Sequence, residues 1–209
     1  MTIHDKLFKY LSMLLPVVSV LIGLYIFSNA IAAIILYHTG IISLLIVSKK
    51  TSLFKEVLKG LNPLTLILLL FIEPLFGIIL YYIWPLLMKD GLIFIQQLNG
   101  FGLNVNNWFA FIIYFSIINP FLEEVFWRAY LNNSKYRIVE IRDLAFAAYH
   151  IFVLVFFVNV QWLIIAFISL TLLSMIYRFF SIKFRGLLIP FISHAIGDIC
   201  IIIAATIRL

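Results

Sequence analysis

Three of the long apolar runs in the chain each contain a short cluster of ionisable side chains. Such groups cost several kcal/mol inside a membrane helix, so each one needs a partner or a task. A carboxylate and an imidazole held close together can take a proton from water and return it to a leaving group, which is the chemistry of hydrolysis. We therefore take these clusters as the candidate catalytic residues. They are Glu123-Glu124-x-x-x-Arg128, Phe146-x-x-x-His150 and His194-x-x-x-Asp198.

The spacing within the clusters predicts which side chains meet on a helix. Glu124 and Arg128 are four residues apart and share a face, so they can form an ion pair, which leaves Glu123 about 100° around the helix. His194 and Asp198 are also four apart, so Asp198 can either orient His194 or face the same ligand. Pro120 precedes Glu124 by four residues and breaks the regular hydrogen bonding there, which can open a water-lined concavity.

The depth of the clusters along their runs is also similar. At about 1.5 Å of rise per residue, Glu123 and His194 each lie about 11 Å from the inner end of their runs, and His150 lies about 10 Å from the inner end of its own. Three helices thus place carboxylates and imidazoles at one level, reached from one side. We expect them to converge in a single pocket.

The composition requires a membrane environment for the helices that carry these residues. The 209-residue chain is 65% hydrophobic and 11% charged, against about 45–50% and 25% in ordinary soluble domains, and its mean hydropathy is +1.15. These values exclude a water-soluble globule, and the richness in aromatic residues excludes a disordered chain. The length favours a single membrane domain, residues 1–209. Cys200 is the only cysteine, so no internal disulfide can form.

Continuous apolar runs long enough to cross a bilayer predict an all-α polytopic bundle of about seven transmembrane helices. Alternating strands of a membrane barrel are excluded because the runs are continuously apolar. Within the third run, Pro74 and Pro85 predict a kink or a strong tilt. Residues 89–105, rich in Gly and Asn, are expected to form a loop. The seven predicted spans are 10–28, 29–48, 63–88, 106–131, 144–160, 161–178 and 187–207.

The placement of the basic residues predicts the orientation. With a cytoplasmic N-terminus, the inner loops hold twelve Lys and Arg and the outer side two, Arg128 being left aside. Residues 51–61 are expected to form an amphipathic helix on the inner membrane surface, attracted by anionic lipid. The net charge of +6 therefore indicates lipid contact and not nucleic acid. We expect a multi-pass protein of a bacterial plasma membrane, with its active site open to the cytoplasm.

The three clusters, in this order on successive helices, resemble the motifs of the CPBP family. That family includes type II CAAX prenyl endopeptidases and bacterial Abi proteins linked to bacteriocin maturation or self-immunity. The resemblance covers residues 106–207, which would form the catalytic core. Two positions depart from the family pattern: Ala129 follows Arg128 where Gly is common, and Asp198 stands where Asn is frequent.

The resemblance implies a role for each residue of the clusters. Glu123 and His150 would activate the attacking water, Glu124 and Arg128 would form an orienting ion pair, and His194 with its partner would stabilise an oxyanion. An ionised Asp198 cannot donate a hydrogen bond to an oxyanion. It would therefore be protonated, hold the tautomer of His194, or bind a metal.

A metal ion is one of two open alternatives for water activation. Two histidines and one or two carboxylates suit Zn²⁺ with a position left for water, and metal-free activation by Glu and His is equally consistent with these residues. The candidate ligands are Glu123, His150, His194 and Asp198.

The expected function is an intramembrane endopeptidase acting on membrane-bound peptides or proteins, prenylated or of leader type. The alternative is a non-catalytic bacteriocin-immunity or scaffolding protein of the same fold. A transporter is disfavoured because the polar residues cluster at one level and no inverted repeat is found. The oligomeric state is left open.

Four further polar or aromatic residues carry weaker expectations. Trp127 and Tyr149, like Phe146, are expected to pack against lipid or helices. His38 and Glu73 lie at matching depth and are hypothesised to pair.

Overall fold

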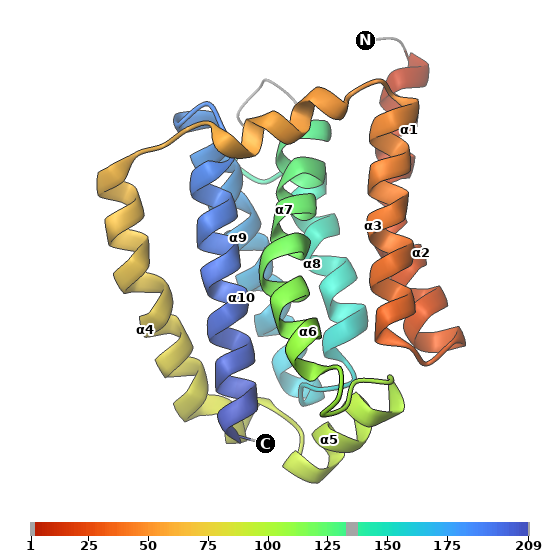
Figure 1. Cartoon of the computed structure of the whole chain (residues 1–209), viewed down its shortest axis with the longest axis vertical. Helices are drawn as coiled ribbons and strands as arrows, with labels where there is room; N and C mark the ends of the chain where they lie inside the picture. Colours follow the sequence, from red (N-terminus) through yellow and green to blue (C-terminus); the bar gives the residue numbers. More distant parts are fainter. Residues whose placement is uncertain (1–2, 133–137, 209) are drawn as a thin grey trace.

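The structure, a computed structural model, describes residues 3–132 and 138–208, without the side chains of residues 3–6. All regular secondary structure in this part of the chain is helical, apart from one isolated antiparallel bridge between Met88 and Val158. In chain order the helices are α1 (Ile3–Ser12), α2 (Leu15–Val20), π-helical η1 (Leu21–Ile26), α3 (Ala30–Val47), 3-10 η2 (Thr51–Leu58), α4 (Pro63–Leu87), α5 (Gly91–Gly100), α6 (Trp108–Ile113), π-helical η3 (Tyr114–Ile118), α7 (Asn119–Glu124), π-helical η4 (Val125–Tyr130), α8 (Ile141–Leu154), 3-10 η5 (Val160–Trp162), α9 (Leu163–Lys183) and α10 (Leu188–Arg208). Figure 1 shows the long helices side by side along one common direction, with η2 running across one end of the bundle and α5 lying at the other.

Within the described residues, six helical stretches are long and apolar enough to cross a membrane. The predicted count of seven is not confirmed, because the run 144–160 corresponds to α8, which has 14 residues. At 1.5 Å per residue it is about 21 Å long, less than the roughly 30 Å of a bilayer core. The six stretches are Leu7–Ile26, Ala30–Val47, Pro63–Leu87, Trp108–Tyr130, Val160–Lys183 and Leu188–Arg208.

The segment from 89 to 105, predicted as a loop, contains a helix. Asp90 caps the N-terminus of α5 by accepting a hydrogen bond from the Leu92 amide, and the run of apolar residues and glutamines that follows supports the helix as far as Gly100. The loop prediction rested on the glycines, which lie at the ends of α5 and not inside it. The prediction was therefore wrong for residues 91–100.

The fourth span is built of alternating α and π turns. The π-helical η3 precedes α7, and the π-helical η4 follows it. Pro120 lies in the first turn of α7, where its missing N–H is tolerated, so the helix continues through this point. The expected break in regular hydrogen bonding therefore takes the form of two widened turns on either side of the carboxylates. In α4, by contrast, the helix is unbroken across Pro74 and Pro85.

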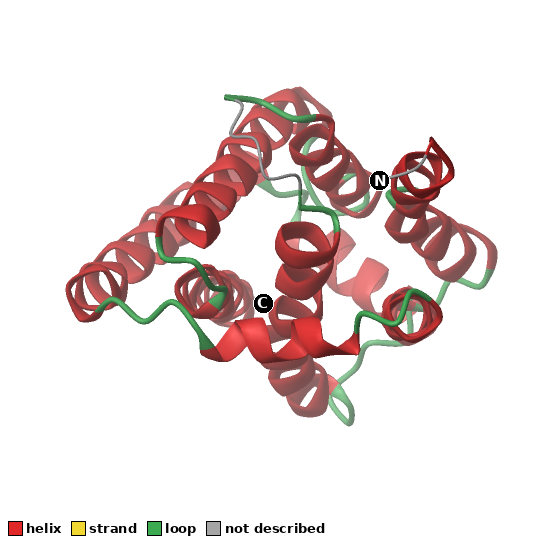
Figure 2. Cartoon of the chain, turned by 90° about the horizontal axis from the view of Figure 1, so that it is seen from above, coloured by secondary structure: helices red, strands yellow, loops and turns green. Residues whose placement is uncertain are grey.

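The helices are arranged around α7 and α10. α10 packs against α4, α9 and α7, and α8 packs against α9 and α2. Figures 1 and 2 place α4 at one edge of the bundle and the α1–α3 pair at the other, with α7 and α10 between them. The main apolar core lies among α3, η4 and α8, where Ile41, Leu45, Val125, Phe126 and Phe146 are almost completely buried.

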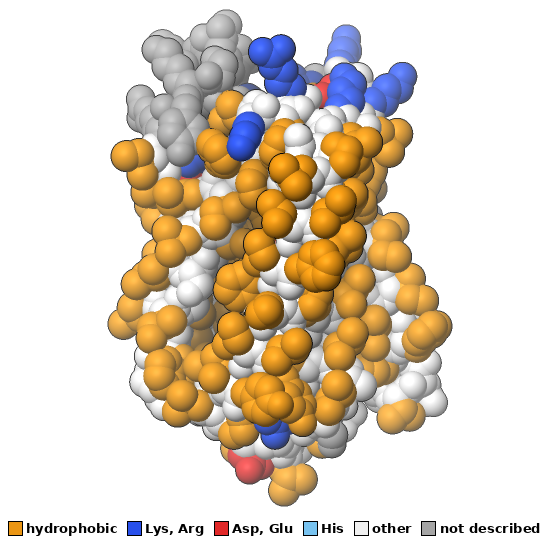
Figure 3. Space-filling model, turned by 90° about the vertical axis from the view of Figure 1, so that its left-hand side faces the viewer, with side chains coloured by type: hydrophobic (Ala, Val, Ile, Leu, Met, Phe, Trp, Pro, Cys, Tyr) orange, Lys and Arg blue, Asp and Glu red, His pale blue; other side chains and the backbone are white. Residues whose placement is uncertain are grey.

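The surface of the bundle is apolar along its length and basic at one end. Figure 3 shows hydrophobic side chains covering one face, with Lys and Arg gathered at one end of it. We call this end, which carries η2 and the turn between α9 and α10, the basic end. Lys and Arg residues that the sequence analysis assigned to the inner loops lie at this end. Lys135 and Arg137 were assigned to an inner loop as well, but they lie outside the described residues. Of residues 51–61, predicted as an amphipathic helix, Thr51–Leu58 form the short 3-10 helix η2 across this end, and residues 59–61 are not helical.

Candidate active site

The two adjacent carboxylates on α7 lie at the centre of a buried polar cluster. Glu123 and Glu124 are 1% and 0% exposed. Asp198 and His194 reach them from α10, Arg128 from η4, and Tyr149 with His150 from α8. The structure therefore brings the three predicted clusters together in one place, as their matching depth along the helices had indicated.

Glu124 is held by two charged or chargeable groups. The Arg128 Nε atom lies 3.3 Å from Glu124 Oε2, which is the ion pair expected from the four-residue spacing. The His194 Nδ1 atom lies 2.9 Å from Glu124 Oε1, and it must donate because an ionised carboxylate only accepts. Arg128 also stacks on the Phe146 ring, with its guanidinium carbon 4.5 Å from the ring centroid. Both oxygens of Glu124 thus face a nitrogen-bearing group, although Oε2 accepts no hydrogen bond within the described residues.

The second nitrogen of His194 faces the remaining carboxylates. His194 Nε2 lies 3.8 Å from both Glu123 Oε2 and Asp198 Oδ2. These distances exceed a direct hydrogen bond, and both oxygens have no hydrogen-bond partner within the described residues. The spacing is one that a single water molecule can bridge. These three atoms therefore define the point where a water could be held and activated.

His150 does not face this point directly. Its Nδ1 atom is 2.7 Å from the Phe146 carbonyl oxygen, and its Nε2 atom is 3.1 Å from the Tyr149 hydroxyl. Tyr149 in turn hydrogen-bonds to Glu123 Oε1. The link between His150 and Glu123 therefore runs through Tyr149, which the sequence had assigned to packing. Its place directly before the motif histidine is the signal that could have identified it.

The proposed metal ligands do not assemble into a coordination site. Both nitrogens of His150 are engaged, by the Phe146 carbonyl and the Tyr149 hydroxyl. Among the described residues, no three His, Cys, Asp or Glu side chains are grouped closely enough to hold a metal ion. The arrangement therefore does not fit a metal site made of the four ligands Glu123, His150, His194 and Asp198.

A second chain of polar contacts supports Asp198 from α3. The Nδ1 atom of His38 is 2.7 Å from the Tyr114 hydroxyl, and its Nε2 atom is 3.1 Å from Asn119 Oδ1. The Asn119 side chain also interacts with the Asp198 carboxylate. Sequence reasoning missed Asn119, because an amide on an apolar helix gives no motif by itself.

The hypothesised pairing of His38 with Glu73 was wrong. Glu73 hydrogen-bonds to Ser193 on α10, next to His194, whereas His38 turns toward α7. Equal depth along two helices does not fix the directions in which their side chains point, and α4 lies on the far side of α10 from α3 (Figure 1).

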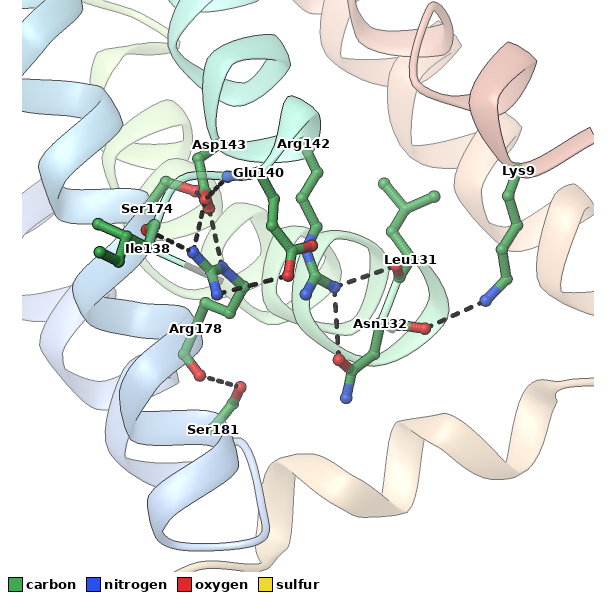
Figure 4. A network of polar contacts seen from close by, with 10 residues as sticks. All are labelled: Lys9, Leu131, Asn132, Ile138, Glu140, Arg142, Asp143, Ser174, Arg178 and Ser181. Atoms are coloured by element: carbon green, nitrogen blue, oxygen red, sulfur yellow. Dashed lines mark hydrogen bonds and ion pairs between the residues drawn. The ribbon is translucent and has the colours of Figure 1, made fainter. Parts of the chain in front are cut away.

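A network of ion pairs fixes α8, the helix of Tyr149 and His150, at the basic end (Figure 4). Asp143 accepts hydrogen bonds from Ser174, at 2.9 Å, and from Arg178 Nη2, at 2.8 Å. Arg142 pairs with Glu140 at 2.9 Å and donates to the Leu131 carbonyl just beyond η4. The network therefore ties α8 both to α9 and to the helix that carries Glu123.

A pocket of about 360 Å³ lies at the basic end, beside the polar cluster. Glu56 of η2 and Arg185 of the α9–α10 turn line it, and Arg128 and Asn132 contribute from the end of the fourth span. Arg128 therefore contacts both this pocket and Glu124. The polar pocket is therefore adjacent to the buried polar cluster, on the side of the cluster that faces the basic end.

The chain matches the family model described as type II CAAX prenyl endopeptidase Rce1-like over residues 105–200. No curated protein and no solved structure gives a significant match. The matched segment contains each of the six candidate catalytic residues, Glu123 to Asp198. Residues 105–200 are thus similar to the Rce1-like type II CAAX prenyl endopeptidases of the CAAX protease (CPBP) family.

Proposed function

We propose that the chain is an intramembrane endopeptidase that hydrolyses peptide bonds through water activated by Glu123. The observation that carries the proposal is the convergence of Glu123 Oε2, Asp198 Oδ2 and His194 Nε2 around one point inside the bundle. The similarity of residues 105–200 to the Rce1-like family supports CAAX endopeptidase activity in general.

The roles follow from the contacts of each group. Glu123 takes a proton from the water on Oε2 while the water oxygen attacks the peptide carbonyl carbon. His194 in its imidazolium form donates Nε2–H to the oxyanion that forms, and Asp198 and Glu124 balance its charge. When the C–N bond breaks, the departing amine takes the proton from Glu123. The products are a carboxylic acid and an amine, between which the second water proton passes to give a carboxylate and an ammonium ion, and Glu123 is returned to its starting state.

Charge balance explains why so many carboxylates are tolerated in this place. Glu124 is paired with Arg128, whereas Glu123 and Asp198 share His194, whose Nε2 atom lies 3.8 Å from each of them. Three carboxylates therefore face one guanidinium and one imidazole, so the site can take up one proton without leaving an unbalanced positive charge. This is the property that the general base requires.

The basic end is proposed to face the cytoplasm. It carries Lys49, Lys50, Lys55 and Lys59 on and around η2, as the inner loops of membrane proteins do. On this assignment, water would enter through the pocket beside Arg128 while a membrane-bound peptide approaches through the bilayer. The plasma membrane of a bacterium remains the proposed location, and leader-type or prenylated membrane peptides remain the proposed substrates.

The proposal is tested by comparing the termini of membrane and secreted peptides in cells that express the wild-type chain, Glu123→Gln or neither. If the variant, present at wild-type level, accumulates the same uncleaved polypeptide as cells without the chain, the protein is a protease and the polypeptide is its substrate. If Glu123→Gln restores the wild-type pattern, the chain acts by binding, as an immunity or scaffolding protein would, and the proposal is refuted.

A further inference from the structure

The Tyr149 hydroxyl lies between the two groups that are expected to activate water. It hydrogen-bonds to Glu123 Oε1, and it lies 3.1 Å from His150 Nε2. The ring is 5% exposed and is stacked against Trp127, with the ring planes 5° from parallel. The hydroxyl is thus held in place by packing, and only its hydrogen is free to rotate.

The donors and acceptors in this series of hydrogen bonds determine which partner the Tyr149 hydroxyl can bind. A carbonyl oxygen can only accept, so His150 Nδ1 carries a hydrogen and donates it to Phe146. In a neutral imidazole, Nε2 is then an acceptor that faces Tyr149. The single hydroxyl hydrogen of Tyr149 therefore has two acceptors in the relay, Glu123 Oε1 and His150 Nε2, and can serve one of them at a time. The neighbouring Tyr37 hydroxyl accepts from Trp127 Nε1, and it can donate its own hydrogen to the Tyr149 oxygen.

The choice between these acceptors depends on whether Glu123 carries a proton. When Glu123 is ionised, the hydroxyl donates to Oε1, because a charged acceptor forms the stronger hydrogen bond. When Glu123 has taken a proton from water, its carboxyl is neutral and the hydroxyl can turn to His150 Nε2. No bond of Tyr149 breaks in this exchange, so atoms and charges balance without a further reactant.

We propose that Tyr149 is a positioning residue for the general base, whose hydroxyl hydrogen bond alternates between Glu123 and His150 as Glu123 gains and loses the water proton. The arrangement leaves Glu123 Oε2 directed at His194, where the water would be held. It also gives His150 a role that does not require contact with the substrate. The kinetic part of this inference rests on the proposed protease function, whereas the hydrogen bond itself does not.

The test is Tyr149→Phe, which keeps the stacked ring and removes only the hydroxyl. The matched control is Tyr130→Phe, because Tyr130 is also buried but its hydroxyl lies 3.4 Å from Ser48, outside the candidate site. Both variants are purified in detergent and titrated with acid while infrared difference spectra are recorded. The band of the protonated Glu123 carboxyl is identified as the C=O stretch that Glu123→Gln removes.

The same comparison identifies the band of the ionised Glu123 carboxylate, which disappears as the C=O band grows. We expect this carboxylate band to move in Tyr149→Phe and to stay in place in Tyr130→Phe, because the ionised carboxylate loses one hydrogen-bond donor only in the first. The C=O band should stay in place in both variants, because the hydroxyl has turned to His150 when Glu123 is protonated. An unmoved carboxylate band or a shifted C=O band in Tyr149→Phe overturns the proposal. So does the absence of any band that Glu123→Gln removes, since Glu123 would then not exchange a proton. None of these results depends on cleavage of a peptide.

Activity on the peptide identified by the cellular test supplies the kinetic readout. We expect kcat of Tyr149→Phe to fall about 10–100-fold with KM within about twofold, as for loss of an interaction that acts on the chemical step. His150→Ala should add little to Tyr149→Phe, because the two residues act as one unit. Additive losses would overturn the link between them. If no variant and no wild-type protein cleaves any peptide, the protease proposal fails, and the infrared result still decides the role of Tyr149.

Discussion

The buried ion pair between Asp143 and Arg178 provides a quantitative test of how the active-site helix α8 is held. Asp143 and Arg178 are almost fully buried, at 1% and 2% exposed, and their closest atoms are 2.8 Å apart. Asp143 also accepts from Ser174 and from the backbone amide of Glu140. Asp143→Ala therefore removes the main acceptor of a buried guanidinium and leaves Ser174 without its partner.

We expect Asp143→Ala to lower the free energy of unfolding by about 3–5 kcal/mol, the usual cost of leaving one charge of a buried pair uncompensated. Arg178→Met alone should cost a similar amount, since it leaves Asp143 buried and charged. The double variant should lose clearly less than the sum, by a coupling of about 2–3 kcal/mol, because neither charge is then left alone. The assay is equilibrium unfolding in mixed micelles, followed by tryptophan fluorescence.

An exposed pair of equal length gives the matched control. Lys59 Nζ and Glu56 Oε1 are also 2.8 Å apart, but their side chains are 57% and 33% exposed. Glu56→Gln should therefore change the free energy of unfolding by no more than about 0.5 kcal/mol. If Asp143→Ala costs as little as this control, or if the double variant is additive, burial does not determine the strength of the pair and the reasoning is refuted.

Two further substitutions test packing and charge around the site. Arg128→Met should lower the free energy of unfolding by about 3–5 kcal/mol, because Glu124 is then buried without its guanidinium partner. A loss below about 1 kcal/mol in the same micelle assay would mean that His194 alone compensates the charge of Glu124. Gly23→Ala should cost about 1–3 kcal/mol, since the added Cβ would lie 2.3 Å from Ala33 and force η1 away from α3. Gly91→Ala is its control, with no atom within 4 Å of the added Cβ, and equal melting of the two variants would contradict the overpacking argument.

The pairing of residues within each helix and the common level of the three clusters could be predicted because they depend on the geometry of single helices. The four-residue spacing of Glu124 and Arg128 and the equal depth of Glu123 and His194 follow from the rise and the rotation per residue, which every α-helix shares. The contacts found among these residues agree with that geometry. Their chemical roles are not tested by it and stay proposals.

The supporting contacts could not be predicted from the sequence, because they depend on how helices rotate against one another. Tyr149 and His150 are neighbours in the chain, and only the packing of the Tyr149 ring on Trp127 decides that the hydroxyl lies between His150 and Glu123. Asn119 likewise meets His38 only because α3 packs against α7. An amide or a phenol within an apolar run carries no spacing rule that identifies its partner.

The ends of the helices were misjudged where charges are buried. Arg142 and Asp143 were expected to lie outside the fifth span, yet both are buried within α8, where Glu140, Ser174 and Arg178 satisfy them. Hydropathy excludes such residues from a helix because it treats every charge as exposed to lipid. The start of α8 could therefore not be predicted without the positions of Ser174 and Arg178 on α9, which contact Asp143.

The π turn η3 changes the direction in which the side chains that follow it in the fourth span point. Ile113, Ile117 and Glu124 lie four and seven residues apart, so in an uninterrupted α-helix all three would share one face. Ile113 and Ile117 are 47% and 48% exposed on the surface of the bundle, whereas Glu124 is 0% exposed. A π turn holds one residue more than an α turn and so delays the helix by about 100°. Deletion of one residue from η3 would restore the α phase and swing the carboxylates toward lipid, so the length of this turn is as much a determinant of the site as the identity of its residues.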